Sequence, residues 1–458
     1  MSAEGNRIEI DAIDFQISCR RFMVRATITR DRHMPLVDEY VLRLLAILDR
    51  MQVSRMRAWF GFSEAEIEAV LVDMGRQKLI EFDGDDVVLA PAGRELFKTV
   101  GEDGAPRVVE VVPLVGDVWF DLVSRNMVPR SRAPNADYLV RLTEQQSARE
   151  LPETFARQAF EQNFRDYARR IRKLPDPDAV NLYSISEVEG GAYGHQLLPA
   201  KLVLDTDKLT VRNTFTELGS NAPAFAKLTV AANDAWQTNT APETTSTAAA
   251  EFDRMTGPSV ILPVIEDPTD AEAWVSLIVG IGREEGTFIP SIGATYLPAN
   301  ISRLLETLQK DGRGEETLEL TWLRPNGSTW GRTTRVPDAL QQIRATARNV
   351  GRHEIHTTLA MPRSTSKPVR KIHRRLFDTG LLLPQRHLPA NLEVLLVPGV
   401  AALVNVHVPV GMHSVPIGGL TKDPRRLARI AERLKAGSAE GWEEIWRPSK
   451  QEHKRPER

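Results

Sequence analysis

The order of apolar patterns between residues 36 and 97 constrains the fold of this chain more than any other feature of its sequence. Apolar residues recur at helical spacing over residues 36–51, and residues 53–60 predict a short second helix. Ser63 and Glu66 then form an S-x-x-E capping box, which predicts the start of a third helix. The expected buried face of that helix consists of Ile67, Val70, Leu71 and Met74.

Two short strand patterns follow the third helix, "LIEF" and "VVLA". Asp83-Gly84-Asp85 between them is typical of a hairpin, because glycine tolerates a positive φ. Pro91 then lies near the start of another helix. Three helices and a two-stranded wing in this order resemble the winged-helix family over residues 35–100. The resemblance implies the fold, and it is compatible with either DNA binding or protein contact, because winged helices serve both.

The charge of the third helix disfavours DNA recognition by this domain. In winged-helix proteins this helix usually enters the major groove. Its outward face here consists of Ala65, Glu68, Ala69, Val72, Asp73 and Arg76. Glu64 and Glu66 crowd its first turn, and the wing adds Asp83, Asp85 and Asp86. Carboxylates there repel phosphate, and only cytosine offers them a donor in the groove. We therefore expect the winged helix to serve as a dock for a protein partner or as a dimer contact.

Composition narrows the class of protein. The 458 residues suffice for two or three domains, and with a net charge of −2 any attraction to nucleic acid must be local. Cys19 is the only cysteine, which excludes an intramolecular disulfide and is typical of a reducing cytosol. The N-terminus has no signal-peptide pattern, and no stretch approaches ~18 uninterrupted apolar residues. We therefore expect a cytoplasmic protein without a membrane partner.

We expect a mixed α/β protein in which α/β domains follow the winged helix. The expected segments are an N-terminal strand segment (1–34), the winged helix (35–100), a middle α/β domain (101–236), a linker or long loop (237–258), a C-terminal α/β domain (259–440) and a charged tail (441–458). The linker rests on "QTNTAPETTSTAAA", which has almost no large apolar residue. Within the middle domain, residues 180–215 predict two or three strands with a turn at Gly190-Gly191.

A first basic group lies on a predicted amphipathic helix over residues 151–174. Its buried stripe consists of Ala156, Phe160, Phe164, Tyr167 and Ile171. The opposite face carries Arg165, Arg169, Arg172 and Lys173. These cations either contact nucleic-acid phosphates or form a solvated face whose arginines pair with neighbouring domains, and the sequence does not decide between the two.

The order of helices and strands over residues 335–440 resembles half of a phospholipase D-type domain. In that family a strand carries H-x-K-x-x-x-x-D and a glycine-serine segment follows, and here "HVPVGMHSVPIGGLT" lies in that place. Pro409 stands where a lysine should follow His407, and Val415 where one should follow His413. Catalysis in that family needs one histidine as nucleophile and a second as acid, each accompanied by a lysine that binds the phosphate. The resemblance therefore implies a phosphate-binding fold that has lost its chemistry.

No other catalytic or metal-binding motif is recognisable in the sequence. The glycines at Gly280 and Gly282 lack a correctly placed third glycine for a dinucleotide site, and G-x-S-x-G, a Walker loop and H-E-x-x-H are absent. His353 and His356 form H-x-x-H on an expected strand, where their separation puts them on opposite faces. We therefore expect no catalytic residue, no metal and no cofactor.

A second basic group is the most informative charge pattern in the chain. Residues 366–380 predict a helix that Gly380 ends and that Val369, Ile372 and Leu376 anchor. Six cations fall within 13 residues, with no acid among them: Arg363, Lys367, Arg370, Lys371, Arg374 and Arg375. This density favours contact with backbone phosphates of nucleic acid. The alternative is a solvated basic helix that faces an acidic partner.

These patterns indicate a non-catalytic nucleic-acid-binding accessory protein of a bacterial DNA-processing or antiviral-defence assembly. Its contacts with nucleic acid would be independent of sequence, and protein partners would bind the winged helix. Two alternatives stay open. One is a phosphodiesterase or nuclease of the phospholipase D type with an unrecognised site. The other is a winged-helix transcriptional regulator whose C-terminal domain senses a small phosphorylated ligand.

Overall fold

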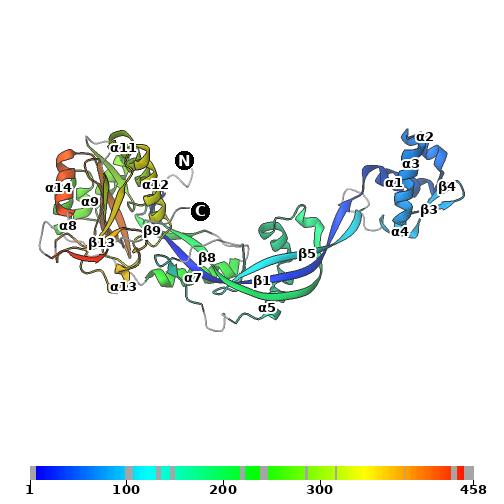
Figure 1. The fold of residues 1–458 in the computed structure, drawn as a ribbon, viewed down its shortest axis with the longest axis horizontal. Helices are drawn as coiled ribbons and strands as arrows, with labels where there is room; N and C mark the ends of the chain where they lie inside the picture. Colours follow the sequence, from blue (N-terminus) through cyan, green and yellow to red (C-terminus); the bar gives the residue numbers. More distant parts are fainter. Residues whose placement is uncertain are drawn as a thin grey trace.

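One long strand, β1 (Arg7–His33), determines the shape of the molecule (Figure 1). It runs from the C-terminal domain to residues 34–97, which we call the winged-helix unit after the order of their helices and strands. In the computed structural model the winged-helix unit lies at one end, a narrow β-sheet arm in the middle and the C-terminal domain at the other end. The structure describes residues 7–97, 107–129, 136–144, 150–216, 222–237, 246–283, 287–314, 317–385, 387–434 and 441–447. The protein is mixed α/β, as predicted.

The arm is built by strands that pair with β1. β5 (Arg107–Asp121) runs antiparallel to its second half, and β8 (Val180–Asp205) runs antiparallel to it over nearly its whole length. The remaining strands of this sheet are short: β6 (Met127–Val128), β7 (Val140–Arg141) and β9 (Thr210–Phe215). The predicted N-terminal segment and middle domain therefore share one sheet, because the pairing joins residues far apart in the sequence.

Alternating side chains of β1 give the arm a core on one face only. Phe22, Val24, Ala26 and Ile28 point to that face and are buried. It is covered by three consecutive helical segments, α5 (Glu153–Gln162), α6 (Phe164–Asp166) and the π-helical η2 (Tyr167–Ile171), and by the 3₁₀ turn η3 (Pro177–Ala179). The arm is thus a sheet stiffened by a helical layer.

The predicted turn at Gly190-Gly191 is wrong, because both glycines lie inside the continuous strand β8. Gly190 pairs with Phe22 next to a register shift in β1. A Cβ on Gly190 would lie 2.7 Å from the Arg20 guanidinium, and a Cβ on Gly191 would lie 2.7 Å from Nε of Arg21. Both glycines thus lie against arginine side chains in a strand that carries a bulge, and a Gly-Gly pair at a bulge resembles a turn signal in sequence.

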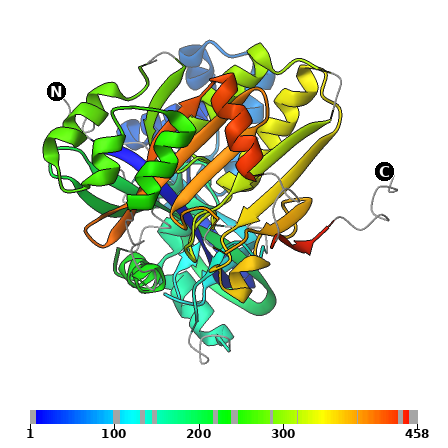
Figure 2. The ribbon, with the colours of Figure 1, turned by 90° about the vertical axis from the view of Figure 1, so that its left-hand side faces the viewer.

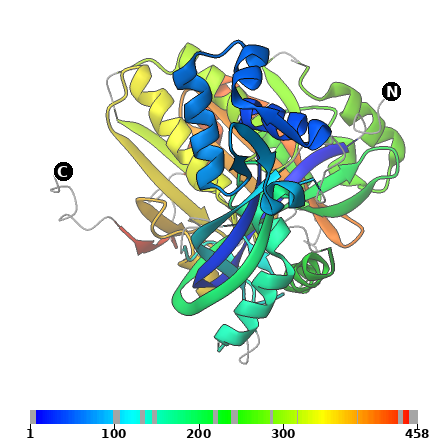
Figure 3. The same cartoon turned by 90° about the vertical axis from the view of Figure 1, so that its right-hand side faces the viewer.

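The winged-helix unit follows the order predicted for it. Its helices are α1 (Leu36–Leu48), α2 (Val53–Phe60), α3 (Glu64–Arg76) and α4 (Pro91–Glu95), and its sheet has the order β2 (Arg50–Gln52), β4 (Asp86–Leu89), β3 (Ile80–Asp83). The capping box is confirmed, since Ser63 and Glu66 exchange both hydrogen bonds. Gly84 has a φ of 64° in the wing turn. Figure 3 shows this unit from its own end of the molecule.

The C-terminal domain is an eight-stranded mixed sheet with helices on both faces (Figure 2). Its strand order is β10 (Phe288–Ile292), β16 (His413–Thr421), β15 (Ala401–Val410), β14 (Leu392–Val397), β11 (Leu318–Leu323), β12 (Ile355–Met361), β13 (Thr379–Leu382), β17 (Glu443–Trp446). Among the described strands of this sheet, the neighbours β11/β12 and β12/β13 pair in parallel, and the other neighbours pair antiparallel. The central strand β14 is apolar apart from Glu393 and wholly buried, as a two-sided core requires.

Two helical layers make the two cores of this domain. One core contains α11 (Pro298–Asp311) and α12 (Arg335–Asn349). The other contains α7 (Ala222–Gln237), α8 (Ser246–Thr256), α9 (Leu262–Glu266), α10 (Ala271–Gly280) and α14 (Pro424–Leu434). Ile10, Ile13 and Phe15 of β1 belong to the second core, so the C-terminal domain takes in the root of the arm.

Two predicted segments differ from the structure. The linker over 237–258 is wrong for residues 246–256, which form α8 and bury Ala248, Phe252 and Met255 in the core. The alanines of this segment favour a helix, and Phe252 and Met255 lie on one side of that helix. The low-complexity composition of the preceding residues obscured this pattern. Residues 238–245 lie outside the described parts. The tail over 441–458 includes β17, which pairs with β13.

We expect Phe252→Ala to destabilise the protein by about 3–5 kcal/mol, because it removes a fully buried aromatic side chain from the larger core. Denaturant unfolding monitored by circular dichroism measures this difference. Asp253→Ala is the matched control, since Asp253 is the exposed neighbour on the same helix and its loss should change little. Equal effects of the two substitutions would contradict the assignment of α8 to the core.

Candidate nucleic-acid interface

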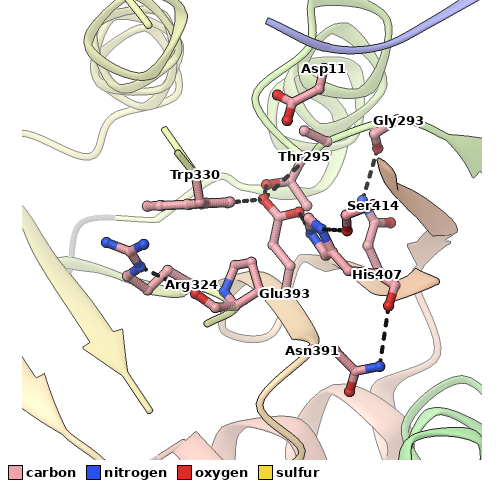
Figure 4. A network of polar contacts seen from close by, with 12 residues as sticks. Asp11, Gly293, Thr295, Arg324, Trp330, Asn391, Glu393, His407 and Ser414 are labelled. Atoms are coloured by element: carbon pink, nitrogen blue, oxygen red, sulfur yellow. Dashed lines mark hydrogen bonds and ion pairs between the residues drawn. The ribbon is translucent and has the colours of Figure 1, made fainter. Parts of the chain in front are cut away.

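The strand pair predicted to carry a lost phospholipase D-type motif forms a buried polar network (Figure 4). The Glu393 carboxylate, on β14, is fully buried and accepts hydrogen bonds from Thr295 Oγ1 at 2.5 Å and Trp330 Nε1 at 2.8 Å. Its second oxygen lies 2.9 Å from His407 Nε2 on β15. His407 Nδ1 lies 3.1 Å from the Ser414 hydroxyl on β16. The network therefore ties three neighbouring strands to the loops above them.

These contacts involve both ring nitrogens of the buried His407. Burial raises the pKa of Glu393, but the hydrogen bond and charge of His407, with the bonds from Thr295 and Trp330, outweigh it and lower that pKa below its usual value. His413 begins β16, where burial lowers its pKa. Pro409 and Val415 lie in the paired strands of the same hairpin. The His407 ring is thus held by structural contacts, and the phospholipase D-type resemblance stays a prediction.

The root of β1 is attached to this network through carboxylates. Asp11 accepts a hydrogen bond from the Tyr296 hydroxyl, and Asp14 accepts one from the Thr334 backbone N–H at 2.7 Å. Burial raises the pKa of Asp11 to about 6, although the hydrogen bonds from Tyr296 and from the backbone of Ala12 act in the opposite direction. Ionisation of Asp11 at neutral pH therefore lowers the free energy of unfolding of the protein.

The first basic group lies on the arm, but the predicted continuous helix over 151–174 is wrong. The helix is interrupted at Asn163 and continues into the π-helical segment, where Arg172 N–H bonds to Tyr167 O at 2.7 Å. The predicted stripe residues Phe160, Phe164 and Tyr167 are nevertheless buried. The side chains of Arg165, Arg169, Arg172 and Lys173 are exposed, and Arg169 pairs with Asp178.

The second basic group is not on a long helix either. α13 (Lys367–Arg370) is a single turn, and Gly380 lies in β13, where the Trp446 ring packs on it. Burial of His373 and Phe377 against the domain core bends the chain after α13. The predicted anchors Val369 and Ile372 are buried, which holds this turn on the domain.

The six cations of the second group fall into two sets. Arg370 donates to Thr365 O and Arg363 O, and Arg363 pairs with Glu443 at 3.3 Å, so these two arginines stabilise local structure. The other four have exposed side chains: Lys367, Lys371, Arg374 and Arg375. The structure therefore leaves four of the six predicted cations available to a ligand.

Arg375 meets two arginines of α12 in one cleft. Arg344, Arg348 and Arg375 line a cleft of about 900 Å³ together with His353 and His356. None of the three arginines makes an ion pair with a residue that the structure describes, and Arg344 only donates to the Thr357 hydroxyl at 3.3 Å. We refer to this site as the arginine cleft.

The carboxylates that line the arginine cleft form no ion pair with its arginines among the described residues. Asp378 accepts two hydrogen bonds of 2.8 Å from Thr357, and Glu354 accepts one from the Thr317 hydroxyl at 3.2 Å. Glu319 also lines the cleft, beyond ion-pair distance of its arginines. Three arginines thus line one cleft, and their forked donors suit a phosphate.

Sequence reasoning missed Arg344 and Arg348. Their i, i+4 spacing in "QQIRATARN" puts them on one side of α12, which is a signal that a helical plot would have shown. The prediction that His353 and His356 lie on opposite faces of one strand is wrong. His353 precedes β12 in a loop, so both histidines reach the same cleft.

Among the described residues, no group of three or more His, Cys, Asp or Glu side chains is arranged to hold a metal ion. Within the same parts of the chain, no helix is both long and apolar enough to cross a membrane. The outward face of α3 is exposed and carries Glu68 and Asp73, with Glu64 and Glu66 in its first turn. This surface offers carboxylates where DNA would present phosphates.

Comparison with known proteins gives distant similarity to solved structures. No protein family and no curated protein matches the chain. A solved structure described as "Structure of TrmBL2, an archaeal chromatin protein, shows a novel mode of DNA binding" is similar over 88% of this chain and 91% of that chain. The sequence identity is 7% and the TM-score is 0.21, which is too low to assign a fold or a function.

We expect Asp11→Asn to stabilise the protein at pH 8 and to have little effect near pH 4. The native state holds the Asp11 proton more tightly than the unfolded chain does, so stability falls as the pH rises from 3.8 to about 6. Asparagine keeps the acceptor for Tyr296 without the charge. The gain at pH 8 is at most about 3 kcal/mol.

Urea unfolding at several pH values tests this expectation, with Asp311→Asn as the control because Asp311 is exposed in the same domain. A variant at position 11 that is less stable than the wild type at pH 8 would show that the charged carboxylate is needed there, contrary to the expectation.

Proposed function

We propose that this chain is a non-catalytic nucleic-acid-binding protein that contacts backbone phosphates through its C-terminal domain. The arginine cleft carries the proposal: Arg344, Arg348 and Arg375 converge there, and the described residues provide no ion-pair partner for them. Arginine forks bind phosphate oxygens with two parallel hydrogen bonds, which suits a backbone and ignores base identity. Lys371 and Arg374, exposed beside Arg375, extend the positive surface beyond the cleft.

The exposed surface of the winged-helix unit carries acidic side chains, whereas the proposed site in the C-terminal domain carries arginines. Glu64, Glu68 and Asp73 on α3 and Asp83 and Asp85 in the wing are exposed. This surface supports binding of a protein partner and disfavours binding of DNA. A chain with a nucleic-acid site at one end and a protein site at the other would act as an accessory factor. Its partners in a DNA-processing or antiviral-defence assembly would supply the chemistry.

A second candidate function is ligand sensing by a transcriptional regulator. The volume of the arginine cleft, about 900 Å³, lies within the range of small-molecule sites. A phosphorylated metabolite would satisfy the same three guanidinium groups. The two functions differ in what binds beyond the cleft, since only a polymer would also reach Lys371 and Arg374.

We expect gel shifts with random oligonucleotides to show binding at low salt that weakens as salt rises. Replacing Arg344, Arg348 and Arg375 by Glu should abolish the shift at moderate salt. Each phosphate contact that is lost lowers the slope of log affinity against log salt by about 0.9 for duplex and about 0.7 for single strands. Lys371→Glu with Arg374→Glu should weaken binding partly.

The matched control reverses three exposed arginines elsewhere, Arg55, Arg76 and Arg425, which changes net charge equally. Its binding should stay close to that of the wild type. No shift for the wild type at low salt would contradict the nucleic-acid proposal. If nucleoside phosphates instead bind the wild type and not the cleft variant, the ligand-sensing function is favoured.

A further inference from the structure

α1 has an apolar face that no described part of the chain covers. Its core side consists of Val41, Leu42 and Leu45, which are fully buried. Four apolar side chains on its other sides are at least half exposed: Leu36 at 67%, Tyr40 at 50%, Ile47 at 79% and Leu48 at 50%. A helix that is apolar on most of its circumference is normally buried on most of it. The described residues therefore provide no partner for the outer face of α1.

The partner is not another described part of the same chain. The arm holds the winged-helix unit at the far end of the molecule from the C-terminal domain (Figure 1). The α3 and wing surfaces of the same unit carry mainly carboxylates. A large apolar face at the free end of an extended molecule is typical of a protein–protein contact.

The spacing on α1 identifies the kind of contact. Leu36, Tyr40, Arg43 and Ile47 are separated by four, three and four residues, which is the a/d spacing of a coiled-coil seam. Glu39 flanks this seam and pairs with Arg43 at 2.7 Å. One charged residue within an otherwise apolar seam is a feature that fixes register and orientation.

We propose that α1 pairs with α1 of a second copy of this chain in antiparallel orientation. A two-fold axis between positions 40 and 43 puts Leu36 opposite Ile47 of the second copy. It also puts Arg43 opposite Tyr40 of that copy and beside its Glu39, so that the cation meets an aromatic ring and a carboxylate. Parallel pairing would put Arg43 against Arg43, which is unfavourable. The seam is thus self-complementary in one orientation.

The contact is small. Thirteen residues of helix are ~20 Å long, and two such helices bury less than the roughly 800 Å² per partner of a standard interface. We therefore expect a dissociation constant in the micromolar range. The dimer would carry two C-terminal domains at its opposite ends. This inference does not depend on nucleic-acid binding.

Sedimentation velocity on the full-length chain tests the proposal, over concentrations from about 1 to about 100 μM, which span micromolar dissociation constants. The wild type should shift from monomer to dimer across this range. Ile47→Glu should weaken the association at least tenfold, and circular dichroism should show an intact fold because Ile47 is 79% exposed. Phe82→Glu is the matched control, since Phe82 is an exposed apolar residue on the wing, and it should not change the association.

Charge exchange tests the orientation. Glu39→Arg and Arg43→Glu should each dimerise poorly alone, and an equimolar mixture of the two variants should form heterodimers. In the heterodimer, the two arginines of one copy lie beside the two glutamates of the other, so both ion pairs between the copies form. Within each variant, positions 39 and 43 carry like charges and cannot pair. A wild type that stays monomeric at every concentration, or a dimer unaffected by Ile47→Glu, would overturn the proposal. Absence of preferential heterodimers would overturn the antiparallel pairing.

Discussion

The backbone pairing of β1 with β5 and β8 holds the two ends of this molecule in one structure. β1 starts in the core of the C-terminal domain, continues through the arm and is separated by two residues from α1 of the winged-helix unit. The segment of β1 paired with β5, from Cys19 to His33, spans ~50 Å at the usual rise of a strand. The separation of the basic C-terminal surface from the acidic winged-helix surface follows from that single strand.

The root of β1 shows how such a strand is anchored. Asp14 accepts hydrogen bonds from Thr333 and Thr334, Glu9 pairs with Arg335, and the Ile10 carbonyl accepts the Ala294 N–H. A buried carboxylate is tolerated only where its hydrogen bonds are satisfied. The Glu393–His407 network meets the same requirement within the central strands. The polar interior therefore serves attachment of the arm, and the candidate binding site lies elsewhere, on the edge where α12 and the segment after α13 meet.

Local signals made part of this structure predictable. The capping box at Ser63, the glycine in the wing and the helical apolar spacing gave the winged-helix unit, since each acts within a few residues. The pairing of β1 with β8 joins Ile8 to Leu204, and no short pattern carries such a long-range contact. Burial of His373 likewise overrode a helical pattern in the second basic group. For the candidate site, Arg375 was predicted, whereas its convergence with Arg344 and Arg348 depends on tertiary packing.

We expect β1 to make the molecule one rigid, extended body with distinct surfaces at its two ends. Small-angle X-ray scattering can test this at concentrations where the chain is monomeric. The scattering curve should match the elongated structure of Figure 1 as a single conformation. A curve of a compact particle, or one that requires a broad set of arrangements of the two ends, would contradict it.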